Sequence, residues 1–306
     1  MNRELHPPIV PQPPVARNGA LPTLIGRYGC ASLRRGLASR RPARETMSEG
    51  FDAVRGVVLD LDGTVYDDRG LIPGADLTVP ALRAAGVRLR FATNTSRHPR
   101  GALVERLRSL GVDAHADEVV TAPRAAAAWL TDRGLTRISL HVVPAIVEEF
   151  AGFTLDERAP EVAVVGDLGD DWSVDRLNRV FRHVLGGARL LAIQKNRYWR
   201  RGGALCLDAG PFVAALEFAT GTTAEVAGKP SPPFFASAAA SIDLALGQVA
   251  VVGDDIHADV RGALAAGALG VLVRTGKFQP ADLDADGPAP TLVIPSIAEL
   301  PSALGL

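Results

Sequence analysis

The chain has 306 residues, enough for one large domain or two ordinary ones, and 47% of them are hydrophobic against 22% charged, a globular composition. Its formal net charge of −1 gives no reason to expect a nucleic acid or an anionic membrane surface as a partner. Cys30 and Cys206 are too few for a disulfide framework or a zinc site, and no run approaches the roughly 18 apolar residues of a membrane span, so we expect a cytoplasmic protein.

The first 47 residues differ in composition from the rest. Residues 1–46 carry eight arginines against two glutamates, together with seven prolines, and show little periodic apolar pattern. Such a segment cannot bury enough apolar surface to fold, so residues 1–47 are predicted to form a disordered, basic, Pro-rich leader. Two alternatives stay open: translation starts at Met47, or the segment is an organelle-targeting leader.

From residue 54 onward, short apolar runs alternate with helical patterns. Strands are predicted at 54–60, 87–92 and 119–120, and helices at 76–86, 99–111 and 123–133. Near the end of the chain the same alternation returns, with strands at 249–252, 269–273 and 292–294 and helices from 232, after 257 and at 296–304. This order predicts an α/β fold with a doubly wound, Rossmann-like parallel sheet.

The middle of the chain predicts a second, smaller α/β unit. Strands are expected at 138–143, 162–165 and 190–193, and helices at 145–150, 173–185 and 211–220. We therefore expect an inserted α/β domain at 136–223, between the two parts of one catalytic core at 48–135 and 224–306. The basic and aromatic stretch from Lys195 to Gly203 is predicted to be a loop of the inserted domain.

Two carboxylates follow the first predicted strand. Asp60 and Asp62 are one residue apart at the carboxyl end of an apolar run, where an open parallel sheet binds its ligands. Such a pair is costly to keep charged unless a cation lies between the two groups, and Mg²⁺ is the simplest occupant. We therefore expect Asp60 and Asp62 to share a Mg²⁺ ion and one of them to do chemistry. Taken alone, the motif also fits an ordinary capped turn.

Three further segments carry polar residues at the predicted carboxyl edge of the same sheet. They are Thr93 and Asn94 after the second strand, Lys229 before a helix, and Asp254, Asp255 and Asp259 after the strand at 249–252. Because the carboxyl ends of parallel strands meet at one edge, these side chains are expected to converge on Asp60 and Asp62.

The combined set fits transfer of a phosphoryl group. Asp60 is the candidate nucleophile, which would form an aspartyl-phosphate, and Asp62 is the candidate acid and base. Thr93, the Asn94 backbone and Lys229 would bind the phosphoryl oxygens. In the remaining roles, Asp254 would complete the Mg²⁺ site, and Asp255 or Asp259 would hold metal-bound water. For Asp255 the alternative is a simple helix cap.

In this order the four segments resemble the motifs of the haloacid dehalogenase superfamily, and the insertion between the second and third resembles its class IIA cap. Residues 223–236 and 251–280 are similar, more narrowly, to its pyrophosphate and phosphohistidine phosphatase branch. The resemblance implies a Mg²⁺-dependent phosphohydrolase for a small phosphorylated compound, pyrophosphate or a phospho-amino acid. It also implies that Asp62 contacts the metal through its backbone carbonyl, and that the cap can join two copies into a homodimer.

The cap loop departs from many class IIA members, which have Asn-x-Asp where this chain has Gln194-Lys195-Asn196. Its Lys195, Arg197 and Tyr198 resemble the pyrophosphate and phosphohistidine branch and are the candidate substrate contacts, because a loop that faces an anion needs positive charge. A solvated hairpin is the alternative. Two other functions stay open at this point: a receiver-like phosphoacceptor or binding module without turnover, and a hydrolase of the same superfamily that cleaves a non-phosphate bond.

Overall fold

A computed structural model describes residues 51–201 and 204–306 of the chain. The predicted leader at 1–47 lies outside these residues.

The larger sheet has six parallel strands in the order β15-β14-β13-β1-β4-β5. Their bounds are Leu292–Ile294 (β15), Leu269–Val273 (β14), Val249–Gly253 (β13), Gly56–Asp60 (β1), Arg88–Thr93 (β4) and Val119–Thr121 (β5). Strand β1 lies in the centre, with β13 and β4 as its neighbours. The predicted doubly wound α/β fold is therefore confirmed.

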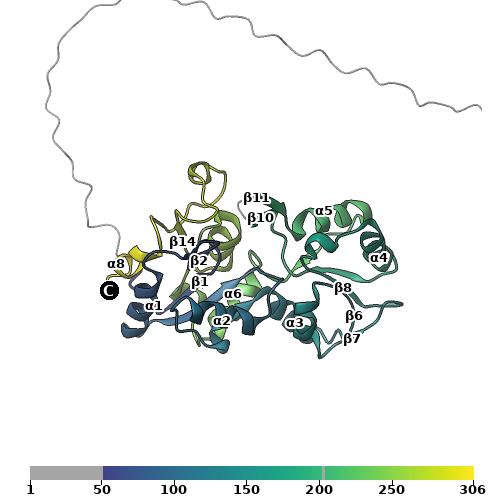
Figure 1. Cartoon of the computed structure of the whole chain (residues 1–306), viewed down its shortest axis with the longest axis horizontal. Coiled ribbons are helices and arrows are strands. Elements are labelled where there is room, and N and C mark those ends of the chain that lie inside the picture. Colours follow the sequence, from purple (N-terminus) through teal and green to yellow (C-terminus); the bar gives the residue numbers. More distant parts are fainter. Residues whose placement is uncertain (1–50, 202–203) are drawn as a thin grey trace, which may run out of the picture. The chain divides into compact units, whose positions relative to one another are not determined.

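Both faces of this sheet are buried at its centre, which is why β1 and β13 are continuous apolar runs rather than alternating ones. Val57 and Leu59 of β1 belong to the apolar cluster that includes residues of helices α1 (Ala75–Ala84) and α2 (Arg100–Ser109). Val58 packs in the cluster of Phe234 and Phe235 on α6 (Pro232–Ala240). Figure 1 shows these helices along the strands. The layers fix β1, and with it the position of Asp60, in the middle of the core.

A second sheet of five parallel strands has the order β12-β9-β8-β6-β7. Its strands are Glu225–Val226 (β12), Arg189–Ala192 (β9), Val162–Val165 (β8), Arg137–His141 (β6) and Thr154–Leu155 (β7). Helix α3 (Ala122–Asp132) packs against this sheet and strand β12 pairs within it, and both lie just outside 136–223. The domain limits drawn from the sequence stay a prediction.

Eight α-helices connect the strands of the described residues. Two of them, α4 and α5, lie beside β8 (Figure 1). They are Ala75–Ala84 (α1), Arg100–Ser109 (α2), Ala122–Asp132 (α3), Val174–Leu185 (α4), Ala209–Thr220 (α5), Pro232–Ala240 (α6), Gly262–Ala266 (α7) and Leu300–Ala303 (α8). Short helical turns are Ala116–Glu118 (η2), Pro144–Phe150 (η3), Gly169–Asp171 (η4), Leu246–Gln248 (η5), Ile256–Arg261 (η6), Pro280–Leu283 (η7) and Ile297–Glu299 (η8). Ser173 caps α4, which the sequence predicted as the helix at 173–185, since its hydroxyl accepts from the Arg176 N–H.

Local structure differs from the predictions in three places. The predicted helix at 145–150 is the 3₁₀ segment η3, and the helix after 257 begins as the π-helical segment η6. The predicted loop at 195–203 includes strand β10 (Tyr198–Arg201), which pairs antiparallel with β11 (Ala204–Leu207). A second small hairpin joins β2 (Tyr66–Asp67) to β3 (Gly70–Leu71).

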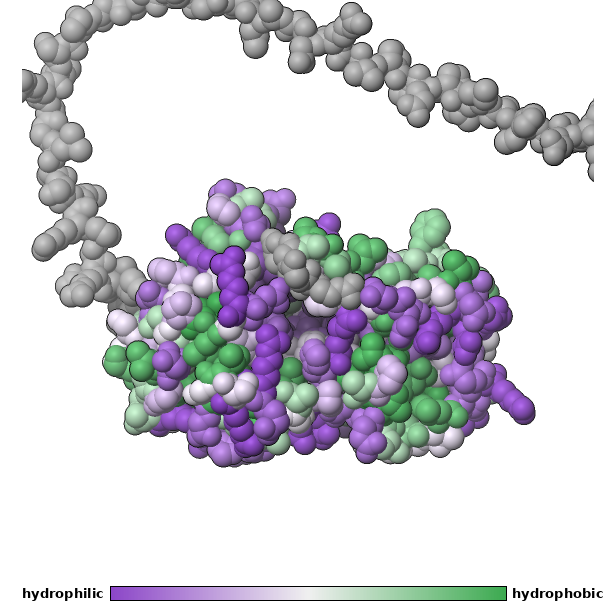
Figure 2. Space-filling model, viewed as in Figure 1, coloured by the Kyte–Doolittle hydropathy of each residue, from purple (hydrophilic) through white to green (hydrophobic). Residues whose placement is uncertain are grey.

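The visible surface is mainly hydrophilic, with hydrophobic residues in small, separated groups (Figure 2). Among the described residues, no helix is both long enough and apolar enough to cross a membrane.

Candidate active site

The strand order brings three of the predicted segments together. Asp60 is the last residue of β1, Thr93 is the last residue of β4, and Asp254 directly follows β13. Since β13, β1 and β4 are neighbours and parallel, these three residues lie at one edge of the sheet. Six polar residues of this edge are buried, namely Asp60, Thr93, Asn94, Lys229, Asp254 and Asp259.

Lys229 joins the nucleophile candidate to the last acidic motif. Its Nζ lies 2.5 Å from Oδ1 of Asp60 and 2.6 Å from Oδ1 of Asp259, and it donates to the Ala92 carbonyl at 3.3 Å. The carboxylates Asp259 and Asp60 raise the pKa of Lys229 against the opposing effect of burial, so the amine stays charged.

Three carboxylates form a group that can hold a cation. Oxygens of Asp60, Asp254 and Asp259 lie within 4.8 Å of one another. Burial is the largest influence on all three and raises the pKa of each carboxyl. Carboxylate oxygens in this number are the ligands that a hard divalent cation such as Mg²⁺ takes, and its charge would offset their mutual repulsion. The residues present therefore fit the expected metal.

Asp254 is held in place by a loop that the sequence did not connect with the site. The Lys277 N–H donates to Oδ2 of Asp254 at 2.6 Å, and the Thr275 hydroxyl donates to the Gly63 carbonyl. Gly63 and Gly276 have positive φ angles, and a Cβ on either would overlap Oδ2 of Asp254. Only glycine permits both this backbone conformation and this close approach.

Asp62 differs from Asp60 in its exposure, since its side chain is open to solvent. The surrounding protein nevertheless removes part of the hydration of its carboxylate, and this desolvation raises the pKa of the carboxyl. The positive charge of Arg106 acts in the opposite direction. Arg106 lies with its guanidinium over the ring of Tyr66, at 4.1 Å from the centroid. A reachable carboxyl with a raised pKa is suited to give and take a proton.

Thr93 and Asn94 make the turn after β4, at the predicted position for phosphoryl contacts. The Thr93 hydroxyl accepts from the Thr95 N–H at 3.0 Å. The Asn94 side chain accepts from the Lys229 N–H through Oδ1 and donates to the Lys229 carbonyl through Nδ2, both at 2.8 Å. The side chain of Asn94 therefore fixes the backbone that carries the ammonium of Lys229.

Asp255 adopts the alternative that its sequence context left open. Its Oδ1 accepts from the N–H groups of His257 and Ala258 and so caps η6, and its Oδ2 pairs with Lys277 Nζ at 3.4 Å. Asp259, in contrast, belongs to the three-carboxylate group.

The loop after β4 also contacts the second sheet. Asn94 Nδ2 donates to Oδ1 of Asn196 at 3.1 Å, and the Asp167 N–H donates to the Ser96 hydroxyl at 3.0 Å. Arg97 pairs with Asp167 at 3.2 Å and stacks on Trp199 at 4.7 Å from the centroid. Neither Arg97 nor Asp167 was a predicted site residue, because no local motif marks a contact between distant loops.

The three predicted cap contacts have different surroundings. Lys195 Nζ lies 2.6 Å from Glu217 Oε2, so its charge already has a partner. Arg197 is exposed, and Tyr198 begins β10 with 42% of its surface exposed. Their contact with substrate stays a prediction.

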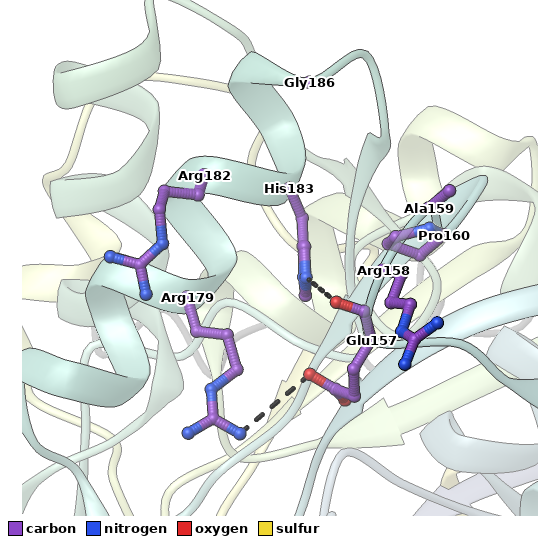
Figure 3. Close-up of a pocket in the computed structure, with 8 residues that line it drawn as sticks. All are labelled: Glu157, Arg158, Ala159, Pro160, Arg179, Arg182, His183 and Gly186. Atoms are coloured by element: carbon purple, nitrogen blue, oxygen red, sulfur yellow. Dashed lines mark hydrogen bonds and ion pairs between the residues drawn. The ribbon is translucent and has the colours of Figure 1, made fainter.

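A cavity of about 530 Å³ lies away from these residues, between α4 and residues 157–160. Figure 3 shows His183 and Arg179 directed at Glu157, the first donating to its carbonyl and the second 3.9 Å from its carboxylate. The basic residues Arg182 and His183 occupy the last turn of α4, where cations offset the helix dipole. The cavity therefore has an ordinary structural explanation.

Family models match the chain in two places. The model described as haloacid dehalogenase-like hydrolase matches residues 57–155, and a second one, HAD-hydrolase-like, matches residues 226–300. The rat (Rattus norvegicus) haloacid dehalogenase-like hydrolase domain-containing protein 2 is 39% identical over 243 residues, which cover 79% of this chain and 93% of that protein. Human (Homo sapiens) phospholysine phosphohistidine inorganic pyrophosphate phosphatase is 38% identical over 235 residues, 75% of this chain and 86% of that protein.

Solved structures share the architecture. The 4-nitrophenylphosphatase of Thermotoga maritima superposes with a TM-score of 0.78 at 30% identity and covers 83% of this chain and 99% of its own. A glycerol phosphate phosphatase from Mycobacterium tuberculosis, solved in complex with magnesium, has a TM-score of 0.73 at 28% identity. The match covers 83% of this chain and 77% of that phosphatase.

Proposed function

Because the chain belongs to the haloacid dehalogenase-like hydrolases, we propose that it is a Mg²⁺-dependent phosphohydrolase that works through an aspartyl-phosphate on Asp60. The observation that carries this proposal is the buried group of Asp60, Asp254 and Asp259 with Lys229 bridging Asp60 and Asp259. A nucleophilic carboxylate, a cation site and a fixed ammonium are the parts that phosphoryl transfer needs.

In the first step a carboxylate oxygen of Asp60 forms a bond to phosphorus while the bond from phosphorus to the leaving atom breaks; that atom is oxygen in an ester or anhydride and nitrogen in phosphohistidine or phospholysine. The Asp62 carboxyl gives its proton to the leaving atom, so that the leaving group departs neutral where it is an alcohol or an amine. Lys229 and the turn at Thr93 and Asn94 hold the phosphoryl oxygens and offset the charge that develops on them.

In the second step Asp62, now a carboxylate, accepts a proton from water, whose oxygen bonds to phosphorus as the bond to Asp60 breaks. Phosphate leaves, and both carboxyl groups regain their starting protonation. Asp60, Asp254 and Asp259, with the backbone carbonyl of Asp62, would hold the metal, which supplies charge neutralisation for the phosphoryl oxygens.

Substrates of the proposed class are small phosphorylated compounds, pyrophosphate and phospho-amino acids. The names of the human relative and of the magnesium-bound phosphatase support this class. A homodimer through the cap stays a prediction alongside it.

The test is hydrolysis of p-nitrophenyl phosphate by the purified chain with and without Mg²⁺, compared with Asp60→Asn. We expect Mg²⁺-dependent release from the wild type and none from the variant. A panel with pyrophosphate, phosphohistidine, phospholysine and glycerol phosphate then ranks substrates by kcat/KM. Undiminished release by Asp60→Asn would reject the proposal, and a stable phosphoenzyme that releases no phosphate would favour the receiver-like alternative.

A further inference from the structure

Lys277 is a cationic residue of the candidate site that the proposed steps do not use. It follows β14 in the loop whose backbone holds Asp254, and its side chain is 32% exposed, against 3% for Lys229. The two ammonium groups therefore differ in access: Lys229 is enclosed between two carboxylates, whereas a ligand can reach Lys277.

Lysine is rare in this chain. The 306 residues contain three lysines among 33 basic residues, and all the others are arginine. Lys195 pairs with Glu217, Lys229 with Asp60 and Asp259, and Lys277 with Asp255. An ammonium is a compact point charge with three donors, which suits a position that several oxygens approach from different directions.

The charge of Lys277 acts on the acidic groups of the candidate site. Its positive charge lowers the pKa of Asp60, Asp62, Asp254 and Asp255. It acts in the same direction on Asp208, the N-cap of α5. The ammonium thus lies within electrostatic reach of the nucleophile and of the residue that caps α5.

The ion pair of Lys277 with Asp255 can break at little cost in free energy. The distance from Nζ to Asp255 Oδ2 is 3.4 Å, long for a charged hydrogen bond. Asp255 keeps two backbone donors, His257 and Ala258, when the ammonium leaves. An anion of the substrate can therefore take the place of Asp255 without leaving a buried carboxylate unpaired.

We propose that Lys277 is a specificity-determining residue that binds the negatively charged leaving group of the substrate, and so favours phosphoanhydrides and phosphoesters whose leaving group carries its own anion. This inference rests on the proposed function. As the bond from phosphorus to the leaving oxygen breaks, negative charge grows on the leaving group, and the Lys277 ammonium offsets it. The alternative is a counter-ion that only balances the acidic cluster.

Binding is tested first, without turnover. The lysines are converted to carbon-13 dimethyl-lysines, and methylenediphosphonate or methylphosphonate is added in the presence of Mg²⁺. Signals are assigned with Lys277→Arg and Lys195→Arg. We expect methylenediphosphonate to shift the Lys277 signal strongly and methylphosphonate to shift it weakly. A Lys277 signal that neither ligand moves, or that both move equally, would overturn the inference.

Kinetics of Lys277→Met form the second arm, with Lys277→Arg as the charge-conserving variant and Arg274→Met as the matched control. Arg274 is an exposed cation of the same loop, and every variant keeps the backbone N–H that holds Asp254. We expect Lys277→Met to lower the ratio of kcat/KM for pyrophosphate to that for p-nitrophenyl phosphate about 10- to 100-fold, the range of a lost charged hydrogen bond, and Lys277→Arg to restore much of it.

An unchanged ratio in Lys277→Met, with a shift only in the Mg²⁺ concentration needed for activity, would mean a counter-ion and would refute the inference. If the wild type hydrolyses none of the substrates but methylenediphosphonate still shifts the Lys277 signal, the proposed hydrolysis fails while the binding role of Lys277 is supported.

Discussion

Lys229 Nζ lies 2.5 Å from Oδ1 of Asp60, and both side chains are almost completely buried. A buried ion pair contributes little net stability, but removal of one partner leaves an uncompensated charge. Here the same ammonium also neutralises Asp259 at 2.6 Å. The catalytic candidate Asp60 and the stability of the sheet edge therefore depend on one side chain.

Substitution of Lys229 by Met should lower the free energy of unfolding by about 3–5 kcal/mol at pH 7, because two buried carboxylates lose their partner. The loss should be smaller at pH 5, where protonation removes the repulsion between the two carboxylates. It should also be smaller when Mg²⁺ is added at pH 7. Urea unfolding measures all three conditions. Equal losses at both pH values would contradict the arrangement described for Lys229, Asp60 and Asp259.

Gly276→Ala should damage the metal site. A methyl group at this position overlaps Asp254 Oδ2, so the carboxylate must move. We expect the Mg²⁺ concentration for half-maximal activity to rise about tenfold or more, since displaced ligands or their supports cost 10–100-fold in metal affinity.

The matched control is Gly267→Ala. Gly267 also has a positive φ, but a Cβ there meets nothing within 4 Å. It should cost about 1 kcal/mol of stability through backbone strain and leave the Mg²⁺ dependence as it was. Similar Mg²⁺ curves for the two variants would show that Asp254 tolerates the methyl group.

Arg97 and Asp167 should act as one unit. Their ion pair ties the loop of Thr93 and Asn94 to the second sheet, so either Arg97→Ala or Asp167→Ala should lower kcat/KM about tenfold, and the double variant little further. Steady-state kinetics of the wild type, the two single variants and the double variant with p-nitrophenyl phosphate give the double-mutant cycle. The exposed pair Asp175 and Arg179 on α4 is the control, and its removal should have no measurable effect. Additive losses for Arg97 and Asp167 would exclude their coupling.

His141 should make stability depend on pH. Burial lowers the pKa of this ring to about 4 from 6.5, and its Nε2 contacts the Ser139 hydroxyl. The unfolded chain therefore takes up a proton as the pH falls below 6.5, while the folded chain does not. Stability from this group is present above pH 6.5 and is lost toward pH 4, by about 2 kcal/mol at pH 5.

Urea unfolding at pH 7 and pH 5 tests this dependence in His141→Asn, which should lose it, and in His115→Asn, which changes an exposed histidine and should keep it. The expectation for His141 fails if its substitution leaves the difference between the two pH values unchanged.

The parts of the site that the sequence predicted share a physical reason. Asp60, Thr93 and Asp254 end or follow buried strands, and the edge of a parallel sheet brings such ends together whatever the loops do. The two open assignments of the last motif depended on local geometry: Asp255 caps η6, and Asp259 one turn later reaches Lys229.

The parts that the sequence did not predict depend on contacts between distant loops. Lys277 lies in the stretch 251–280 that resembles a family branch, but the resemblance gives it no role, and Arg97 has no motif. The backbone of Lys277 contacts Asp254, and Arg97 contacts Asp167 and Trp199. The hairpin of β10 and β11 is the alternative that the sequence left open for the basic stretch, where two short runs lie on either side of Gly202-Gly203.

Trapping of the phosphorylated enzyme tests whether Asp60 is the nucleophile. The wild type and Asp62→Asn are mixed with substrate and Mg²⁺, quenched with acid, reduced with borohydride and digested for mass spectrometry, because an acyl phosphate is reduced to the alcohol. We predict homoserine at position 60 in both proteins, in larger amount in Asp62→Asn, which lacks the base for the second step. Substrate turnover by the wild type without homoserine at position 60, or with a reduced residue elsewhere, would contradict Asp60 as the nucleophile.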